Sequence, residues 1–271
     1  MLSDITIGQY YKAQSVVHRM DARMKLILTV LFIVIIFLCK NFFSLAVMFV
    51  LTAVSILVSR VPFRMFFKSL KPIIPIILIT AALNIFYVKK GTELLSFWKI
   101  SVTTGGLSTA FFMAVRIICL IMVSSLLTYT TVPTQLTDAI ERLLSPLNVL
   151  HISVHTLAMM MTLALRFIPT LIEEIERITN AQKARGADFE SGRFLERVKA
   201  MIPVLIPLFV SAFRRAYELS FAMTCRCYHG GEGRTRMKQM KLSAVDFAAL
   251  GVFLLSLAGV IVLNRFFQAM I

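Results

Sequence analysis

Charged residues are scarce in this chain: they make up 16% of its 271 residues, against about 25% in average soluble proteins. Hydrophobic residues account for 58%, and the mean hydropathy is +0.81. Such a composition excludes intrinsic disorder, which requires low hydrophobicity. With only four cysteines, the chain is also too poor in thiols to be a small disulfide scaffold.

The short motifs of common catalytic sites are missing as well. None of the 11 glycines precedes a lysine, so there is no phosphate loop of the form GxxxxGK[ST]. The chain contains no HExxH and no GxSxG motif, and no paired acids were identified inside an apolar run. We therefore expect a protein that is not an enzyme and that needs no cofactor.

Long apolar runs take up much of the sequence instead. Crossing a bilayer as a helix takes about 20 predominantly apolar residues. Five runs approach or reach that length: Met24–Cys39, Phe43–Ser59, Ile73–Val88, Gly106–Thr128 and Ala244–Leu263. The sequence predicts an integral membrane protein with about five transmembrane helices.

The net charge of +15 raises the question of nucleic-acid binding, because basic chains often bind it. The distribution of the basic residues favours a membrane surface instead. Four lie in residues 1–25, four in 60–71 and fifteen in 129–242, whereas only five lie in the alternate segments. Since basic residues accumulate on the cytoplasmic side, we expect a cytoplasmic N-terminus, an external C-terminus, contact with membrane lipid and no nucleic-acid partner.

Residues 129–242 are too long for a loop and have helical periodicity. Apolar residues recur at three- and four-residue spacing over about 152–185 and 193–226, with charged residues on the other faces. A shorter helix is predicted over 133–144. We expect an all-α fold in three parts: a four-span domain over 1–128, a domain of amphipathic cytoplasmic helices over 129–242, and a last span over 243–271. Three prolines, Pro169, Pro203 and Pro207, are expected to kink or segment the long helices.

Several polar residues are candidates for a site. Arg116 lies near the middle of the fourth run, where a charge is costly and hence a functional candidate; the alternative is a structural partner within the bundle. His151 and His155 share a helix face, and Cys225, Cys227 and His229 lie close in sequence. Neither set provides the four ligands of a structural zinc site, so no metal is expected.

Two arginines end the predicted long helices, 41 residues apart: Arg185 in Ala184-Arg185-Gly186 and Arg226 in Cys225-Arg226-Cys227. Arginine near a helix C-terminus offsets the helix dipole, and glycine provides a left-handed cap. A guanidinium at a helix end also presents a fork of donors to carboxylates or carbonyls of a partner protein. The repetition favours a protein that is held at two points.

Over nearly its whole length, the chain resembles the transmembrane T component (EcfT) of energy-coupling factor transporters, the ABC-type vitamin importers. The segments that carry the resemblance are SVVHRMDARMK at 15–25, LLT at 126–128 with DAIE at 138–141, LALRFIPT at 163–170, the Ala-Arg-Gly at 184–186 and GGEGRT at 230–235. A colinear set of this extent is far more specific than any one of its motifs.

The resemblance implies a coupling subunit of shared type. In that family, X-Arg-X motifs at the ends of cytoplasmic coupling helices dock into two ABC-type ATPase subunits (EcfA-like), and another surface holds an interchangeable substrate-binding S component. By position, Ala184, Arg185 and Gly186 would form the first docking motif, and Cys225, Arg226 and Cys227 the second. The second departs from the family pattern because Cys227 replaces glycine, which puts its cap geometry in question; Gly230 and Gly231 offer a later helix end.

Two other interpretations remain open. One is a dedicated T component for cobalt, nickel or biotin uptake. The other is an integral-membrane enzyme that acts on lipid and recognises phosphate with Arg116 and the basic cytoplasmic face.

Overall fold

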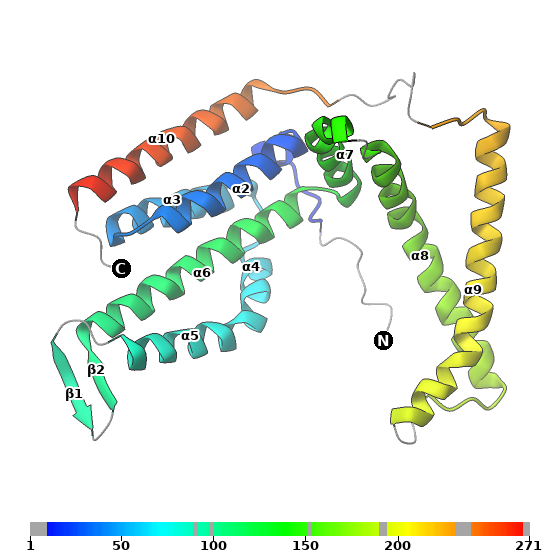
Figure 1. Cartoon of the computed structure of the whole chain (residues 1–271), viewed down its shortest axis with the longest axis horizontal. Coiled ribbons are helices and arrows are strands. Elements are labelled where there is room, and N and C mark those ends of the chain that lie inside the picture. The colour runs from blue at the N-terminus through cyan, green and yellow to red at the C-terminus, as the bar shows by residue number, and fades with distance from the viewer. Residues whose placement is uncertain are drawn as a thin grey trace. The chain divides into compact units, whose positions relative to one another are not determined.

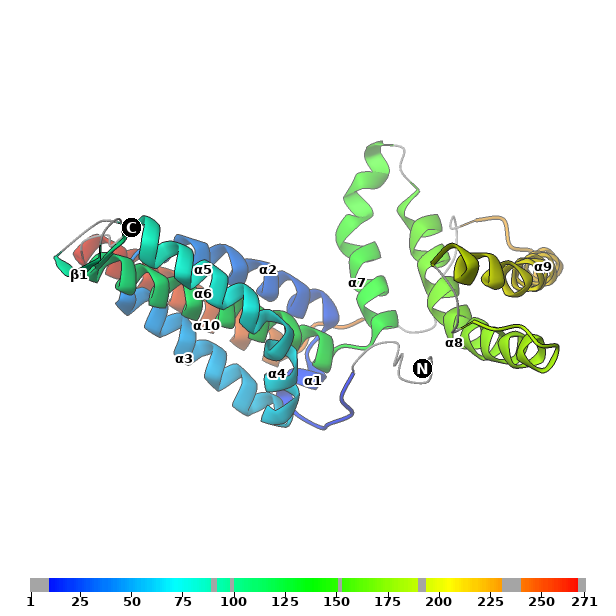
Figure 2. The same cartoon turned by 90° about the horizontal axis from the view of Figure 1, so that it is seen from below.

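The computed structural model describes residues 10–88, 92–97, 100–150, 153–189, 194–230 and 240–267. These residues form two compact units (Figures 1 and 2). The bundle unit consists of Gly8–Ala139 with Gln239–Ile271, and the α8–α9 unit runs from Ile140 to Lys238. The prediction of an all-α integral membrane protein is confirmed, with the addition of one short β-hairpin.

Helix α6 (Thr104–Thr130) organises the bundle unit, because it contacts α2 (Ala22–Leu38), α3 (Phe42–Ser59) and α5 (Ile74–Tyr87). Helix α10 (Ala244–Phe266) packs on α2 and α3. Figure 2 shows these helices lying side by side. The core between them is apolar and tightly closed; its fully buried side chains include Phe32, Ile36, Met48, Phe112 and Val260.

The outward faces of the same helices are also apolar. Large side chains such as Phe37, Leu57 and Leu78 are 60% or more exposed. Contiguous apolar surface of this kind is rare on soluble proteins. It fits a bundle whose surroundings are hydrocarbon, and the chain is a multi-pass membrane protein.

Among the described residues, five helical stretches qualify as membrane spans by length and composition: α3, Phe63–Tyr87, α6, α8 (Val154–Ala184) and α10. The number agrees with the sequence prediction, but the set differs. Helix α2 was predicted to be a span, but with 17 residues it is slightly too short to qualify as one. Helix α8, which was not predicted to cross the membrane, does qualify. The apolar stretch of α8 has a mean hydropathy of 1.4, compared with 2.4 for α3, α6 and α10.

Short elements complete the first half of the bundle unit. Helix α1 (Val16–Arg19) begins at Ser15, whose side chain accepts the His18 N–H. Helix α4 (Phe63–Leu70) and a 3₁₀ turn, η1 (Lys71–Ile73), lead into α5. Proline stands in the first turn of both η1 and α5, where its missing N–H leaves no intrahelical bond unmade.

Between α5 and α6 lies an antiparallel hairpin of β1 (Glu93–Phe97) and β2 (Ile100–Thr103), which the sequence analysis did not predict. Its last residue, Thr103, donates to the Val88 carbonyl at 2.7 Å and accepts the Gly106 N–H at 3.2 Å. A Cβ at Gly106 would lie 3.0 Å from the carbonyl oxygens of Ile85 and Val88. Glycine therefore permits the close approach of α5 and α6.

The helices of the α8–α9 unit that the structure describes follow one another in the predicted order. Helix α7 (Pro133–Leu144) crosses the boundary between the units and has the predicted bounds; η2 (Ser145–Leu150) follows it, and α8 and α9 (Phe194–Cys225) pack against each other. Neither long helix is segmented at its prolines: α8 continues through Pro169, and α9 through Pro203 and Pro207.

Candidate functional site

Helix α8 ends in a Schellman-type cap with Arg185 as its capping residue. The Gly186 N–H donates to the Lys183 carbonyl at 3.0 Å, and the Ala187 N–H donates to the Gln182 carbonyl at 3.0 Å. Gly186 has a φ of 88°, in the left-handed region that this cap requires. A Cβ on Gly186 would meet no atom within 4 Å, so it is the backbone conformation that favours glycine there.

Helix α9 ends in the same way, 41 positions further along the chain. The Cys227 N–H donates to the Thr224 carbonyl at 2.9 Å, and the Tyr228 N–H donates to the Met223 carbonyl at 3.0 Å. Cys227 takes the left-handed conformation with a φ of 55°. The question raised by its replacement of glycine is thus answered: the cap forms with cysteine, and the helix ends at Cys225, without extending to Gly230; Gly231 lies outside the described residues.

Both motifs are open to partners. All six of their residues are exposed: Ala184, Arg185, Gly186, Cys225, Arg226 and Cys227. Within the part of the chain that the structure describes, the side chains of Arg185 and Arg226 make no hydrogen bond or ion pair. Two guanidinium groups are therefore presented at the ends of two helices on identical backbone caps.

A groove of about 610 Å³ lies between α8 and α9 and is lined near the end of α9 by Thr224 and Tyr228, the residues on either side of the second motif. Its wall is mostly apolar, with Met160 and Phe167 from α8 and Leu219 and Met223 from α9. Arg215 also lines it and pairs with Glu174 across the two helices, and Glu174 accepts the Ser211 hydroxyl at 2.8 Å. This polar link fixes the pairing of α8 with α9 while leaving the apolar wall uncovered.

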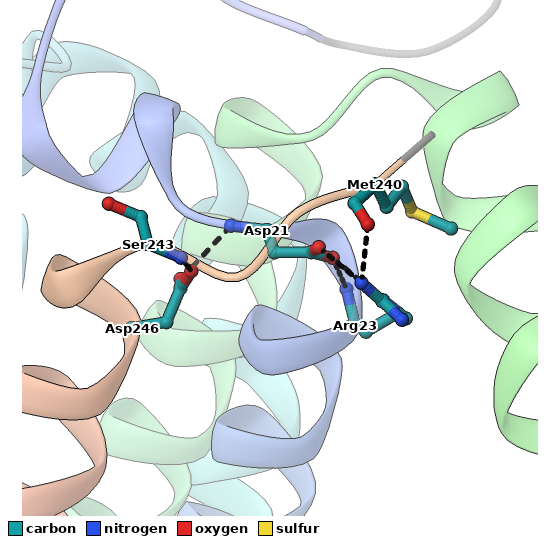
Figure 3. A network of polar contacts seen from close by, with 5 residues as sticks. All are labelled: Asp21, Arg23, Met240, Ser243 and Asp246. Carbon is teal, nitrogen blue, oxygen red and sulfur yellow. Dashed lines mark hydrogen bonds and ion pairs between the residues drawn. The ribbon is translucent and has the colours of Figure 1, made fainter. Parts of the chain in front are cut away.

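A second polar cluster, in the bundle unit, was missed by the sequence analysis (Figure 3). Asp246 is 0% exposed, although it lies in the first turn of the last apolar run. Its carboxylate accepts the Ser243 N–H at 2.7 Å and the Asp21 N–H at 3.0 Å. One carboxylate therefore binds both helix beginnings, α10 and α2, where the helix dipoles favour negative charge.

Two basic residues of the first turn of α2 extend this cluster. Arg23 donates to the Asp21 carboxylate at 2.8 Å and to the Met240 carbonyl at 3.1 Å. Lys25, only 5% exposed, donates from Nζ to the Thr130 carbonyl at 2.8 Å, at the C-terminal end of α6. We call Asp21, Arg23 and Lys25, with their partners Thr130, Met240 and Asp246, the α2 clamp. In the sequence, this cluster could have been suspected only from charged residues, Lys25 and Asp246, at the first positions of two apolar runs.

The charge state of Asp21 follows from these contacts. Burial acts to raise the pKa of its carboxyl, but hydrogen bonds from the Arg23 side chain and backbone N–H outweigh it and hold the pKa below its ordinary value. Asp21 is therefore ionised at neutral pH, as its pairing with the guanidinium requires.

Arg116 lies at the other end of α2. Its Nη2 donates to the carbonyl of Cys39, the C-cap of α2, at 2.6 Å, and its guanidinium lies 4.7 Å from the centre of the Phe112 ring. Arg116 is 14 positions before Thr130 and therefore about 21 Å from it along α6. The polar turn between α2 and α3 lies beside it. These contacts are those of a helix cap, which favours the structural interpretation of Arg116.

The same turn is tied to the end of α10. Asn264 donates to the Leu38 carbonyl at 2.8 Å, and Asn41 donates to the carbonyls of Leu263 and Phe267 at 3.2 and 2.8 Å. The bundle unit thus has a polar junction at each end of α2, with apolar packing between them.

The residues considered for metal binding do not come together in the described parts of the chain. No group of three or more His, Cys, Asp or Glu side chains there could hold a metal ion. His155 pairs with Glu141 at 2.9 Å, and His151 lies outside the described residues.

Known proteins identify the family. Residues 13–237 match the family described as Cobalt transport protein (CbiQ). A protein of Ruminiclostridium cellulolyticum is 48% identical over 98% of this chain and 100% of its own length; one of Clostridium kluyveri is 50% identical over 92% and 93%, and one of Bacillus subtilis 44% identical over 98% and 100%. All three are named energy-coupling factor transporter transmembrane protein EcfT. The chain belongs to this family of EcfT transmembrane proteins.

Proposed function

We propose that this chain is the coupling subunit of an ABC-type vitamin importer, and that Arg185 and Arg226 are the points where two ATPase subunits dock. The observation that carries the proposal is the pair of similar caps, each of which presents an exposed arginine whose side chain has no hydrogen bond or ion pair to the described residues. A guanidinium fork forms directional, charge-assisted bonds with carboxylates and carbonyls. Because each arginine ends a helix of more than 30 residues, a partner that moves the arginine also moves the helix.

ATP hydrolysis belongs to the partners in this proposal. Closing of the ATPase dimer on ATP draws the two arginine motifs together, and α8 and α9 carry that displacement away from the docking points. The absence of a phosphate loop in this chain is consistent with that division of labour.

The S component is proposed to bind on the apolar surface of the α8–α9 unit. Along α9 the side chains of Phe209, Phe213 and Phe221 are 61%, 72% and 65% exposed. An exposed aromatic surface of this kind is typical of a binding interface. Met160 and Met223 in the neighbouring groove are flexible side chains that adapt to different partners, which favours a shared T component over a dedicated one.

The proposal also orients the chain. The arginine motifs must face the cytoplasm, where ATP is available, so the N-terminus is cytoplasmic and the C-terminus external. Helix α8 then lies at the membrane surface and does not cross it, in line with its lower hydropathy and its ion pair with α9.

The docking assignment is tested by charge reversal. Arg185→Glu with Arg226→Glu should release the ATPases when the complex is purified in detergent through a tag on this chain. Arg197→Glu is the matched control, since Arg197 is an exposed arginine of α9 away from its cap. A double variant that keeps as much ATPase as the control would overturn the assignment.

A dedicated T component is the second candidate, and the name of the matched family, Cobalt transport protein, favours keeping it. Mass spectrometry of partners that co-purify from the native membrane separates the two: several S components indicate the shared type, and a single one the dedicated type. The lipid-enzyme interpretation relies on phosphate recognition by Arg116, whose Nη2 donates to the Cys39 carbonyl instead. Turnover of lipid by the purified chain alone would revive it.

A further inference from the structure

Two segments of the chain, which we call the two passages, join helices α8 and α9 to the bundle unit. The first passage follows the end of α6 at Thr130 and leaves the bundle unit within α7, after Ala139; the second rejoins the bundle unit ahead of Met240, which leads to the start of α10. Any displacement of α8 and α9 that is carried by the chain itself must reach the bundle unit through these two segments. What holds the segments inside the bundle unit therefore matters for coupling.

The first turn of α2 holds both of them. Lys25 binds the Thr130 carbonyl at the first passage, and Arg23 binds the Met240 carbonyl at the second. Asp246, three residues after Ser243, binds the Asp21 N–H. Three alternate residues of one helix turn thus contact segments that are 105, 217 and 225 positions away in the sequence.

The chemistry of these contacts makes them stiff. Every one involves a charged donor or acceptor, and such bonds are stronger than those between neutral groups. Asp246 and Lys25 are also buried, at 0% and 5% exposure, so water cannot replace a bond that is broken. The two passages are consequently both attached to α2, and through α2 they are attached to each other.

From this geometry we propose that the α2 clamp is the element through which movement of the α8–α9 unit is transmitted to the membrane helices, with Arg23, Lys25 and Asp246 as positioning residues. The inference rests on the proposed coupling function. The proposal also assigns a role to residues 15–25, a segment that carries the family resemblance but has no part in the docking of ATPases. In this proposal the clamp residues act by holding the two passages in a fixed position relative to α2.

The test uses the complete transporter, with this chain, its ATPases and an S component, reconstituted in lipid vesicles. The quantity measured is substrate accumulated per ATP hydrolysed. Lys25→Met keeps the apolar stem and removes the donor, Arg23→Gln loosens the Met240 contact, and Asp246→Asn removes the shared charge. We expect each variant to retain its ATPases and their hydrolysis while the ratio falls at least about fivefold, the lower range of allosteric coupling.

Arg19→Gln is the matched control, because Arg19 lies in the same N-terminal segment and is exposed; its ratio should equal that of the wild type. Arg23→Lys, which keeps a charged donor, should restore coupling lost in Arg23→Gln. If Asp246→Asn or Lys25→Met fails to fold, Arg23→Gln decides the question, since it leaves the Asp246 carboxylate and its two N–H bonds in place.

The outcomes separate the two proposals. A wild-type ratio in folded clamp variants, with Arg23→Gln among them, overturns the clamp and leaves the docking function standing. A wild-type chain that neither retains ATPases nor supports uptake overturns the proposed function itself. A loss of ratio in Arg19→Gln equal to that in Arg23→Gln would also contradict the clamp, because it would show sensitivity to any charge in the segment.

Discussion

Gly186 and Cys227 occupy the same position in two helix caps, with φ angles of 88° and 55°. Each follows an arginine that caps its helix, and each donates its N–H to the carbonyl three residues earlier. The second cap therefore has the geometry of the first although its residue carries a side chain. The backbone bonds of the cap set the position of each arginine, and glycine only makes the left-handed conformation less costly.

Cys227→Gly should stabilise the end of α9. A left-handed residue with a Cβ costs about 1–2 kcal/mol, and the greater freedom of glycine in the unfolded chain offsets part of that gain. Hydrogen exchange measured by mass spectrometry should show slower exchange of the Tyr228 amide, which donates to the Met223 carbonyl. The reciprocal change, Gly186→Ala, should speed exchange of the Ala187 amide. Equal exchange in both variants and the wild type would contradict this account of the caps.

Gly106→Ala should destabilise the bundle unit by about 1–3 kcal/mol, the usual cost of overpacking. Its Cβ would lie 3.0 Å from two backbone carbonyl oxygens of α5 and its end, which cannot move away as a side chain would. Thermal unfolding in detergent measures the effect. Gly259→Ala is the control, since a Cβ there meets nothing within 4 Å; a similar loss in both variants would argue against close approach as the cause.

Arg116→Met should lower stability without impairing docking. The substitution leaves the Cys39 carbonyl without its donor, and an unmade bond at a buried group costs about 1–3 kcal/mol. We expect a lower unfolding temperature but an unchanged amount of ATPase bound and unchanged uptake per folded transporter. Uptake abolished in a variant of normal stability would instead assign Arg116 a functional role.

Acid should weaken the bundle unit partly through Asp21. Because its pKa is lower in the folded chain than in the unfolded chain, its ionised form contributes stability that is complete above the unfolded pKa and lost as pH falls through the folded one. The unfolding temperature of the wild type should therefore decline from about pH 5 downward. Asp21→Asn should start lower at neutral pH and decline less steeply; parallel curves would show that this carboxyl does not contribute.

Much of this architecture could be predicted from the sequence, because apolar runs and helical periodicity are local. The bounds of α7 were predicted to the residue, since Pro133 and the Ser145-Pro146 pair mark its ends. The hairpin of β1 and β2 was missed: two strands of five and four residues give too short a pattern. The α2 clamp was missed for a different reason. Asp21 and Asp246 are adjacent only after folding, and no local pattern pairs residues 225 positions apart.

The prolines illustrate the same limit. Pro203 and Pro207 each remove a backbone donor, yet α9 continues through both over its 32 residues, and Gln182 of α8 donates to the Pro203 carbonyl at 3.4 Å. A local rule predicted the weak points of the helix, and tertiary packing decided whether it would break there.

The most direct test of the central claim counts ATPase subunits on the intact complex by native mass spectrometry, without ATP. The account predicts two ATPase subunits on the wild type and on Arg197→Glu, one on Arg185→Glu or Arg226→Glu, and none on the double variant. Two subunits retained by the double variant would contradict it.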